Sequence, residues 1–469
     1  MKKGIIYLVM IIMCCLVVTY FVINHVEIKD ANSEVKDRNI VYSVNDIKED
    51  LKSISNFNLH DNNVICATSR GLLAKDSEGN ITCDLADSYE VKDNGIEYTF
   101  KIKDDCYFSD GTKITAKDFV EFFRDISDCE NDKNIEALLN IFGISDYRNK
   151  KIDFENTGIT CENDTLRIRL NKPNNNFIDE LTKVQYKLRK SLNLWSNIVQ
   201  NNKKIICSGE YSIDYADNDQ IIMHKNKYSN SQNNIDSLIF KRDESSEFAM
   251  ADYQVGKRDI VEEPPKDYLL LLNDKGELCI NNSNKVMVTE FNDSLPVNER
   301  CGIYTLLYKS ITDYTNKNMY YIEPSECSYT IEEKNNINNI QNRKVFMNNT
   351  KNKLSDIKSV SILAEDNPEN RYWIEYFKGY LKDEYSINVN YYLATCDEIK
   401  DNELKKRYDV YMYCTDYFIS KDNSTDVLFS NCISRTLFFY YKNIAISNNL
   451  SDFKLDFYGD FIFEQMKKD

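Results

Sequence analysis

An uncharged N-terminal stretch constrains this chain more than any other feature of its sequence. Lys2 and Lys3 are followed by twenty residues without a charge, from Gly4 to Ile23. A helix of about 20 residues spans about 30 Å, the thickness of a bilayer core. Because lysines next to a membrane helix remain on the cytoplasmic side, the stretch predicts a transmembrane anchor over residues 1–24, with the rest of the chain outside the cell.

Two other signals can give a chain an apolar N-terminus. A cleaved signal peptide has a shorter apolar core that ends in small residues, and neither feature is present here. Lipidation at Cys14 or Cys15 is the second alternative, although Met13 precedes Cys14 and the apolar stretch continues beyond Cys15. Both an anchor and a lipid predict a protein at the extracellular face of the cell membrane.

The composition of the whole chain indicates a folded, acidic protein. Of its 469 residues, 42% are hydrophobic and 29% are charged, which is typical of globular domains. A length of 469 residues is enough for two or three domains. The formal net charge of −16 argues against a nucleic-acid partner, because binding to phosphates requires an excess of Lys and Arg.

Cysteines leave two interpretations open. Fourteen are present, and apart from Cys14 and Cys15 no two of the remaining twelve form a CxxC pair. The sequence therefore does not support a zinc site or thioredoxin-like chemistry. Outside the cell the twelve could form disulfides, and buried free thiols explain their irregular spacing equally well.

Alternating and periodic segments predict an α/β fold after a polar tether over residues 25–53. Tyr98, Phe100 and Ile102 alternate with polar residues, and residues 166–170 repeat the pattern, so both segments are predicted as half-buried strands. Thr115 and Asp118 are spaced to begin a helix by capping it.

The C-terminal half contains the pattern of a βαβ unit. Residues 358–393 read as a strand, a helix and a second strand, with Asn367 as the helix cap and Pro368 at its first position. Another strand is predicted over residues 408–413, and the Asn- and Lys-rich residues 333–356 are predicted as a surface loop. A βαβ unit implies parallel strands, which favours α/β lobes over a sandwich.

A series of short motifs, found in a fixed order, resembles one known family. The first four are Gly71–Asp76 with Gly79, Leu85–Tyr89, Asp93–Phe100 (DNGIEYTF) and Phe108–Ala116 (FSDGTKITA). The later ones are Asn163–Phe177, Ser208–Tyr211, His224–Phe240, Tyr253–Ile260 and Ile444–Phe463. In this order they resemble the family 5 extracellular solute-binding proteins, the peptide and nickel receptors of ABC importers.

The resemblance implies a two-lobed fold of the type II periplasmic-binding-protein class that closes on its ligand. The larger lobe would hold residues 54–261 and 435–469, and the smaller lobe residues 262–434. The chain would cross between the lobes near Pro264-Pro265 and near Ser434. It also implies a monomer that captures a short peptide and delivers it to an ABC permease in the membrane.

The resemblance also indicates where a peptide would bind. Oligopeptide receptors of this family bind the ligand's amine with the Asp of a Cys-Ala-Asp-Tyr-like motif, and Cys414-Thr415-Asp416-Tyr417 stands at the matching place. Asp416 is therefore predicted as the partner of the ligand's ammonium group, with Tyr417 beside it. A turn aspartate that only caps the next segment is the alternative. Asn292 is predicted either to contact the ligand or to order the crossing.

Several residues depart from the family pattern and leave a second function open. Arg70 stands where the family commonly has Glu, Tyr89 replaces Trp, and Glu210 replaces Pro. A divergent surface sensor or scaffold of the same fold that transports nothing is thus the alternative. Only three histidines are present, which disfavours a nickel receptor.

The sequence predicts neither catalysis nor a cofactor. It contains no Gly-x-Ser-x-Gly elbow, no His-Glu-x-x-His helix and no phosphate-binding Gly-x-x-x-x-Gly-Lys loop. Adjacent carboxylates such as Glu262-Glu263 are interpreted as solvated surface pairs.

Overall fold

The computed structural model describes residues 38–57, 59–231, 233–317, 322–325, 357–395, 397–416 and 433–469. It divides the chain into two units, Met1–Arg38 and Asn39–Asp469, and the elements below belong to the second. The predicted anchor, Cys14, Cys15 and the loop predicted over 333–356 lie outside the described residues. Within the described ranges, no helix combines the length and the apolar character that crossing a bilayer requires.

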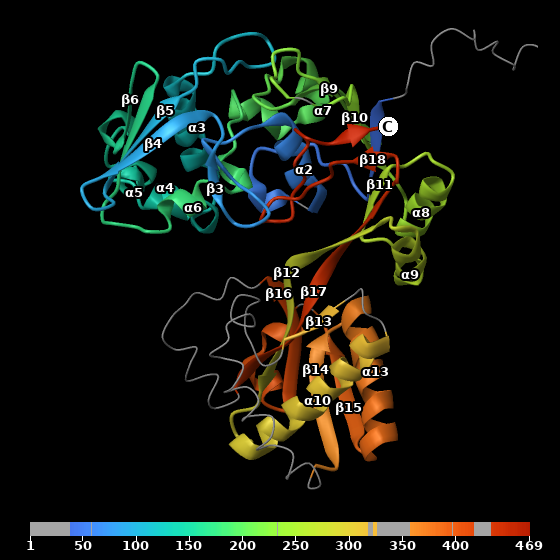
Figure 1. Cartoon of the computed structure of the whole chain (residues 1–469). Helices are drawn as coiled ribbons and strands as arrows, with labels where there is room; N and C mark the ends of the chain where they lie inside the picture. The colour runs from blue at the N-terminus through green and yellow to red at the C-terminus, as the bar shows by residue number, and fades with distance from the viewer. Residues whose placement is uncertain are drawn as a thin grey trace, which may run out of the picture. The chain divides into compact units, whose positions relative to one another are not determined.

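An eleven-stranded sheet forms the framework of the second unit (Figure 1). Ten strands follow the order β15-β14-β16-β12-β17-β11-β1-β10-β9-β8, and β13 pairs with β17 off this path. Their bounds are β1 Asn39–Val44, β8 Tyr211–Ala216, β9 Gln220–Lys225, β10 Ser237–Arg242, β11 Ile260–Glu262, β12 Leu278–Phe291, β13 Ile322–Pro324, β14 Ser359–Glu365, β15 Asn388–Ala394, β16 Val410–Asp416 and β17 Ser434–Ile446.

A first apolar core surrounds one end of this sheet and extends over a separate four-stranded sheet. That smaller sheet has the order β4-β5-β7-β6, with β4 Ala86–Lys92, β5 Glu97–Ile102, β6 Ile159–Glu162 and β7 Thr165–Arg169. Tyr98, Phe100 and Ile102 are buried and their neighbours face outward, which confirms the two half-buried strands predicted from alternation.

Helix α3 (Ala116–Cys129) packs against the smaller sheet and begins where the sequence predicts. The backbone N–H of Thr115 donates to the Asp118 carboxylate at 2.8 Å, so the predicted capping box is confirmed. Phe119, Phe123 and Ile126 recur at helical spacing and are fully buried.

A second apolar core is built around the βαβ unit β14–α13–β15. β14 and β15 run parallel in the register Ser359↔Asn388, as predicted. Between them, α13 (Pro368–Tyr385) begins after Asn367, whose side chain accepts a hydrogen bond from the N–H of Asn370 at 2.8 Å. Helix α10 (Val297–Lys317) packs against α13 beside the same sheet (Figure 1).

Strands β12 and β17 each contribute to both cores. On β12, Cys279 packs against the first core and Met287 belongs to the second, while on β17 Ile444 belongs to the first and Phe438 to the second. The two strands pair with each other along their lengths, from Leu278↔Ala445 to Glu290↔Ser434. The chain therefore changes core inside these strands and not at the predicted crossings, Pro264-Pro265 and Ser434.

The predicted tether is shorter than residues 25–53. β1 begins at Asn39 and lies between β10 and β11 in the large sheet, parallel to both. Ile40, Tyr42 and Leu51 are buried in the first core. Residues 39–53 read as polar in sequence because the apolar positions of one short strand are too few to stand out, yet residues 39–44 form a central strand.

The described cysteines make no disulfide. These are nine residues, and Cys106, Cys207 and Cys301 among them are buried. The interpretation as buried thiols therefore applies to these three. Cys327, Cys396 and Cys432 lie outside the described residues.

Gly209 allows two parts of the first core to approach closely. A Cβ added there would lie 2.4 Å from the Thr68 carbonyl carbon and 2.5 Å from the Ser69 nitrogen, both backbone atoms. We expect Gly209→Ala to lower the free energy of unfolding by about 2 kcal/mol or more, as overpacking does. Gly379→Ala is the matched control, because a Cβ in that helix meets nothing within 4 Å. Chemical denaturation checks both, and equal stability of the two variants would contradict the argument.

Candidate functional site

Three parallel strands of the second core end at one edge of the sheet. β14 pairs in parallel with both β15 and β16, so their carboxyl ends, Glu365, Ala394 and Asp416, share that edge. Helix α13 begins there, directly after β14. In open α/β sheets, ligands bind outside the carboxyl ends of the strands. This edge is therefore the first place to expect a ligand.

Asp416, the predicted ammonium partner, is the last residue of β16 and lies at this carboxyl edge. It pairs with Lys285 of β12, which stands just before the point where β12 enters the second core. Tyr417 lies outside the described residues. Asp416 thus lies at a strand end, next to the region where β12 passes from one core to the other.

Asn292 lies at the opposite end of the same ladder. Its neighbour Phe291 pairs with Val410, the first residue of β16, whereas Lys285 pairs with the last. The Asn292 amide donates to the carbonyl oxygens of Lys406 at 2.7 Å and Tyr408 at 3.3 Å. Its oxygen accepts from the Ser294 hydroxyl at 2.7 Å. The fold therefore does not bring Asn292 and Asp416 together. The side-chain amide of Asn292 hydrogen-bonds with main-chain carbonyls and with the Ser294 hydroxyl in the adjacent turn.

A buried ion-pair network lies where β11 and β17 pair, and sequence reasoning missed it. The Glu262 carboxylate is 3.0 Å from Lys442 Nζ and 3.1 Å from His60 Nδ1. The Asn63 amide also donates to Glu262, at 3.2 Å, and Lys442 Nζ donates to the Gly459 carbonyl at 3.0 Å. Glu262 was interpreted as one of a solvated pair, and this is wrong, because its side chain is 0% exposed.

Glu262 and Lys442 stabilise each other's charged form. Burial acts to raise the pKa of Glu262, but the Lys442 ammonium and the His60 contact outweigh it and lower the pKa to about 2. Burial likewise acts to lower the pKa of Lys442, and the Glu262 carboxylate outweighs it, so the Lys442 pKa is raised. Glu262 and Lys442 are therefore both ionised at neutral pH.

Arg70, one of the departures from the family pattern, lines a hollow of about 530 Å³ in the first core's part of the molecule. Its guanidinium contacts the Asp84 carboxylate at 2.6 Å, and Asp84 also accepts from the N–H of Gly71 at 3.0 Å. Asp105 and Cys106 also line this hollow. Because Asp84 neutralises Arg70, the guanidinium acts first as a structural cation that holds the turn before Gly71.

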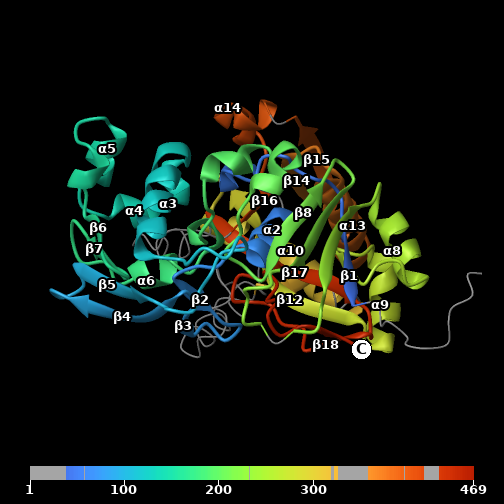
Figure 2. The same cartoon turned by 90° about the horizontal axis from the view of Figure 1, so that it is seen from above.

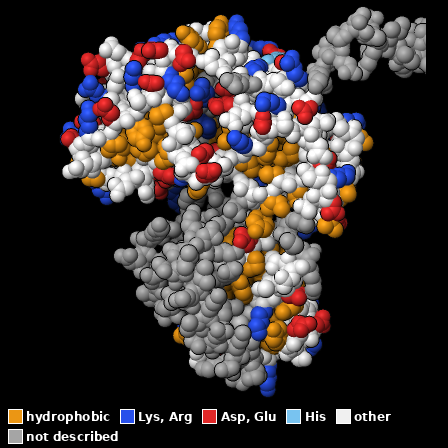
Figure 3. All heavy atoms as spheres, in the orientation of Figure 1, with side chains coloured by type: hydrophobic (Ala, Val, Ile, Leu, Met, Phe, Trp, Pro, Cys, Tyr) orange, Lys and Arg blue, Asp and Glu red, His pale blue; other side chains and the backbone are white. Residues whose placement is uncertain are grey.

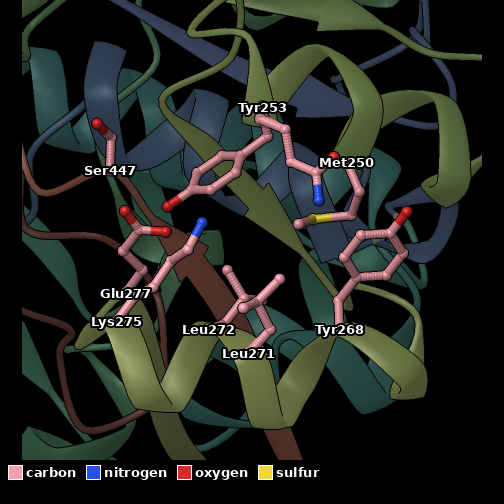
Figure 4. A pocket seen from close by; sticks show the side chains of 9 residues that line it. Met250, Tyr253, Tyr268, Leu271, Leu272, Lys275, Glu277 and Ser447 are labelled. Carbon is pink, nitrogen blue, oxygen red and sulfur yellow. The ribbon is translucent and has the colours of Figure 1, made fainter.

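A smaller pocket lies between helices α8 (Ser246–Gln254) and α9 (Lys266–Lys275), which are neighbours in both overall views (Figures 1 and 2). Figure 4 shows the Tyr253 hydroxyl pointing toward Glu277, with Met250 and Leu272 on the apolar side. Its volume is about 80 Å³, whereas ligand pockets typically have about 300–1,000 Å³. This pocket is too small for a peptide.

The surface carries no extended patch of one charge on the face that Figure 3 shows, where acidic and basic side chains are interspersed over the described part. In the described ranges, no group of three or more His, Cys, Asp or Glu side chains is arranged to hold a metal ion. The carboxyl edge at Asp416 is therefore the candidate site that the strand topology indicates.

Comparisons with known proteins agree with this description. The profile of the family described as bacterial extracellular solute-binding proteins, family 5 Middle, matches residues 80–296. A binding protein of Haemophilus influenzae is 26% identical over 244 residues, which cover 52% of this chain and 44% of that protein. The dipeptide-binding protein of Lactococcus lactis subsp. cremoris is 35% identical over 96 residues, 20% of this chain and 18% of that protein.

Structural similarity extends over more of the chain. The unliganded open form of the periplasmic murein tripeptide-binding protein MppA, known from Escherichia coli, aligns with a TM-score of 0.70 and 15% identity, over 92% of this chain and 98% of that one. The predicted resemblance to family 5 extracellular solute-binding proteins and the two-lobed α/β fold are confirmed. The matched stretches span 44% and 18% of the two curated relatives, less than half of either.

Proposed function

We propose that this chain, which resembles the family 5 extracellular solute-binding proteins in sequence and in fold, captures short peptides outside the cell and delivers them to an ABC import permease. In this proposal Asp416 receives the ligand's ammonium group, Tyr417 lies beside it, and Asn292 orders the second core. The chain acts as a monomer without catalysis, held at the extracellular face of the cell membrane by its N-terminal stretch.

The position of Asp416 is the observation that carries the proposal. The main chain of Asp416 ends β16 at the edge where α/β sheets present ligand-binding groups. A buried ammonium requires a carboxylate partner, because an unpaired charge is very costly away from water. The backbone at the same strand end can donate and accept the hydrogen bonds that an extended peptide requires. The dipeptide- and tripeptide-binding proteins among its relatives support the same ligand class.

Native mass spectrometry of the full-length chain with a pool of random di- to hexapeptides tests the proposal. We expect bound peptides with free amino termini, and calorimetry with the peptides recovered should give the same preference. If no peptide from the pool binds, the proposal is wrong, and the same fold would then serve a surface sensor or scaffold that transports nothing.

A further inference from the structure

The hollow beside Arg70 has the size of a ligand site. Its volume is about 530 Å³, and ligand pockets typically have about 300–1,000 Å³. Its walls come from the end of β5, the turn that follows β5, and Asn230. Most of the side chains that line it are charged, and these are Arg70, Lys101, Lys103, Asp87, Asp104 and Asp105. The pairing of these charges therefore decides which ligand the hollow can bind.

Three of the six charges have an ionic partner of opposite sign beside them in simple pairs. Lys101 Nζ lies 3.8 Å from the Asp87 carboxylate. Lys113 Nζ lies 3.0 Å from the carboxylate of Asp104. Because these pairs are neutral as units, they offer a ligand little net charge.

Lys103 and Asp105 are the charges that remain. In the described part of the chain neither makes an ion pair, and the only hydrogen bond of Lys103 is made by its main chain. Asp105 Oδ2 accepts from the Asn230 amide at 3.3 Å. The Arg70 guanidinium contacts Asp84 through Nε and Nη2, so within the same residues its Nη1 remains available as a donor.

The Cys106 thiol indicates that these charges lie close together. It lines the same hollow and is 6% exposed, and burial raises its pKa. The charge of Arg70 acts to lower this pKa, that of Asp105 to raise it, and that of Lys103 to lower it. Because charge effects fall with distance, all three groups lie within electrostatic reach of one side chain.

From this arrangement we propose that the hollow is a second binding site, which takes a small zwitterion of the amino-acid kind. The ligand's carboxylate accepts from Arg70 Nη1 and Lys103 Nζ, and its ammonium donates to Asp105. Hydrogen bonds between groups of opposite charge are stronger than neutral ones, so a ligand with both charges satisfies both sides of the hollow. The inference goes beyond the proposed function and does not depend on it.

A mixture of all proteinogenic amino acids tests the proposal by ligand-observed NMR with the full-length chain, and calorimetry then gives the affinity of each one that binds. We expect Lys103→Met and Asp105→Asn each to weaken this binding about fivefold or more, since each removes a charge-assisted hydrogen bond. The N-acetyl derivative of the bound amino acid has no ammonium, so only Lys103→Met weakens its binding further. The amide derivative has no carboxylate, so only Asp105→Asn does.

The control is Lys92→Met, because Lys92 lies on β4 outside the hollow, 3.2 Å from Glu90 and 56% exposed. It is expected to leave the affinities unchanged. If Lys103→Met folds poorly by circular dichroism, Lys103→Gln replaces it with the same expectation. A chain that binds no amino acid, or binding that Lys103→Met and Asp105→Asn leave unchanged, would overturn this proposal alone, whereas the peptide pool tests the proposed function separately.

Discussion

Asp416→Ala is expected to reduce the affinity for peptides with a free amino terminus by about 100-fold or more. Removing one partner of a buried, hydrogen-bonded charge pair costs about 2–5 kcal/mol, and each 1.4 kcal/mol is a factor of ten. The loss is large because the ligand's ammonium would remain away from water without a counter-ion. Isothermal titration calorimetry measures it directly.

Two comparisons make the Asp416 result specific. N-acetylated peptides carry no amine charge, so their affinity is expected to change little in the same variant. Asp397→Ala removes an aspartate from the same half of the chain whose side chain is 93% exposed, and it is expected to bind like the parent. An Asp416→Ala variant that binds free and acetylated peptides as the parent does would refute the role of this carboxylate.

Lys442→Met is expected to destabilise the protein by about 3–5 kcal/mol, the range found when a buried ion pair loses one partner. Glu262 would keep a carboxylate with 0% exposure and without its ammonium partner 3.0 Å away. Combining it with Glu262→Gln is expected to restore most of the loss, because neither charge of this pair then remains. Urea denaturation measures these differences.

An exposed ion pair provides the control for Lys442. Lys203 lies 2.8 Å from Asp214, and their side chains are 68% and 50% exposed. Exposed pairs contribute between about 0 and 1 kcal/mol, so Lys203→Met is expected to leave stability nearly unchanged. Similar losses for the two lysine variants would show that burial does not set the strength of the Glu262 network.

Acid is expected to remove the contribution of Glu262. Its pKa falls from an ordinary value of 4.5 to about 2 in the folded protein, so it contributes stability that is complete above pH 4.5 and lost as the pH falls toward 2. The difference corresponds to about 3 kcal/mol. The parent is therefore expected to lose more stability than Glu262→Gln between pH 5 and 2. Parallel pH profiles would contradict this.

Local sequence patterns predicted the elements whose signals are contiguous in the chain. The alternation at Tyr98, Phe100 and Ile102 and the caps at Thr115 and Asn367 depend on neighbours within a few residues, and the structure has these strands and helices as predicted. The parallel pairing of β14 and β15 was also predicted, because a helix that connects two neighbouring strands of a sheet implies that they run parallel.

Features that depend on distant parts of the chain were not predictable in the same way. Glu262 and Lys442 are 180 positions apart, and nothing near either residue indicates that β11 and β17 pair. One crossing was predicted near Pro264-Pro265 and the other near Ser434, but β12 and β17 continue through both cores, and their apolar residues read alike on either side. The role of Asp416 came from the resemblance, since a strand-end aspartate alone is most often a turn residue.

Strands that contribute to two cores also limit which segments of such a chain can be exchanged. The first core needs β11 and β17, which pair across residues 260–262 and 444–446, so its residues come from both ends of the sequence. A chimaera in which only the N-terminal part is replaced would pair a foreign β11 with the original β17. Exchange of either half of the chain as one contiguous segment is thus expected to destabilise the first core, because strands from its two ends would no longer match.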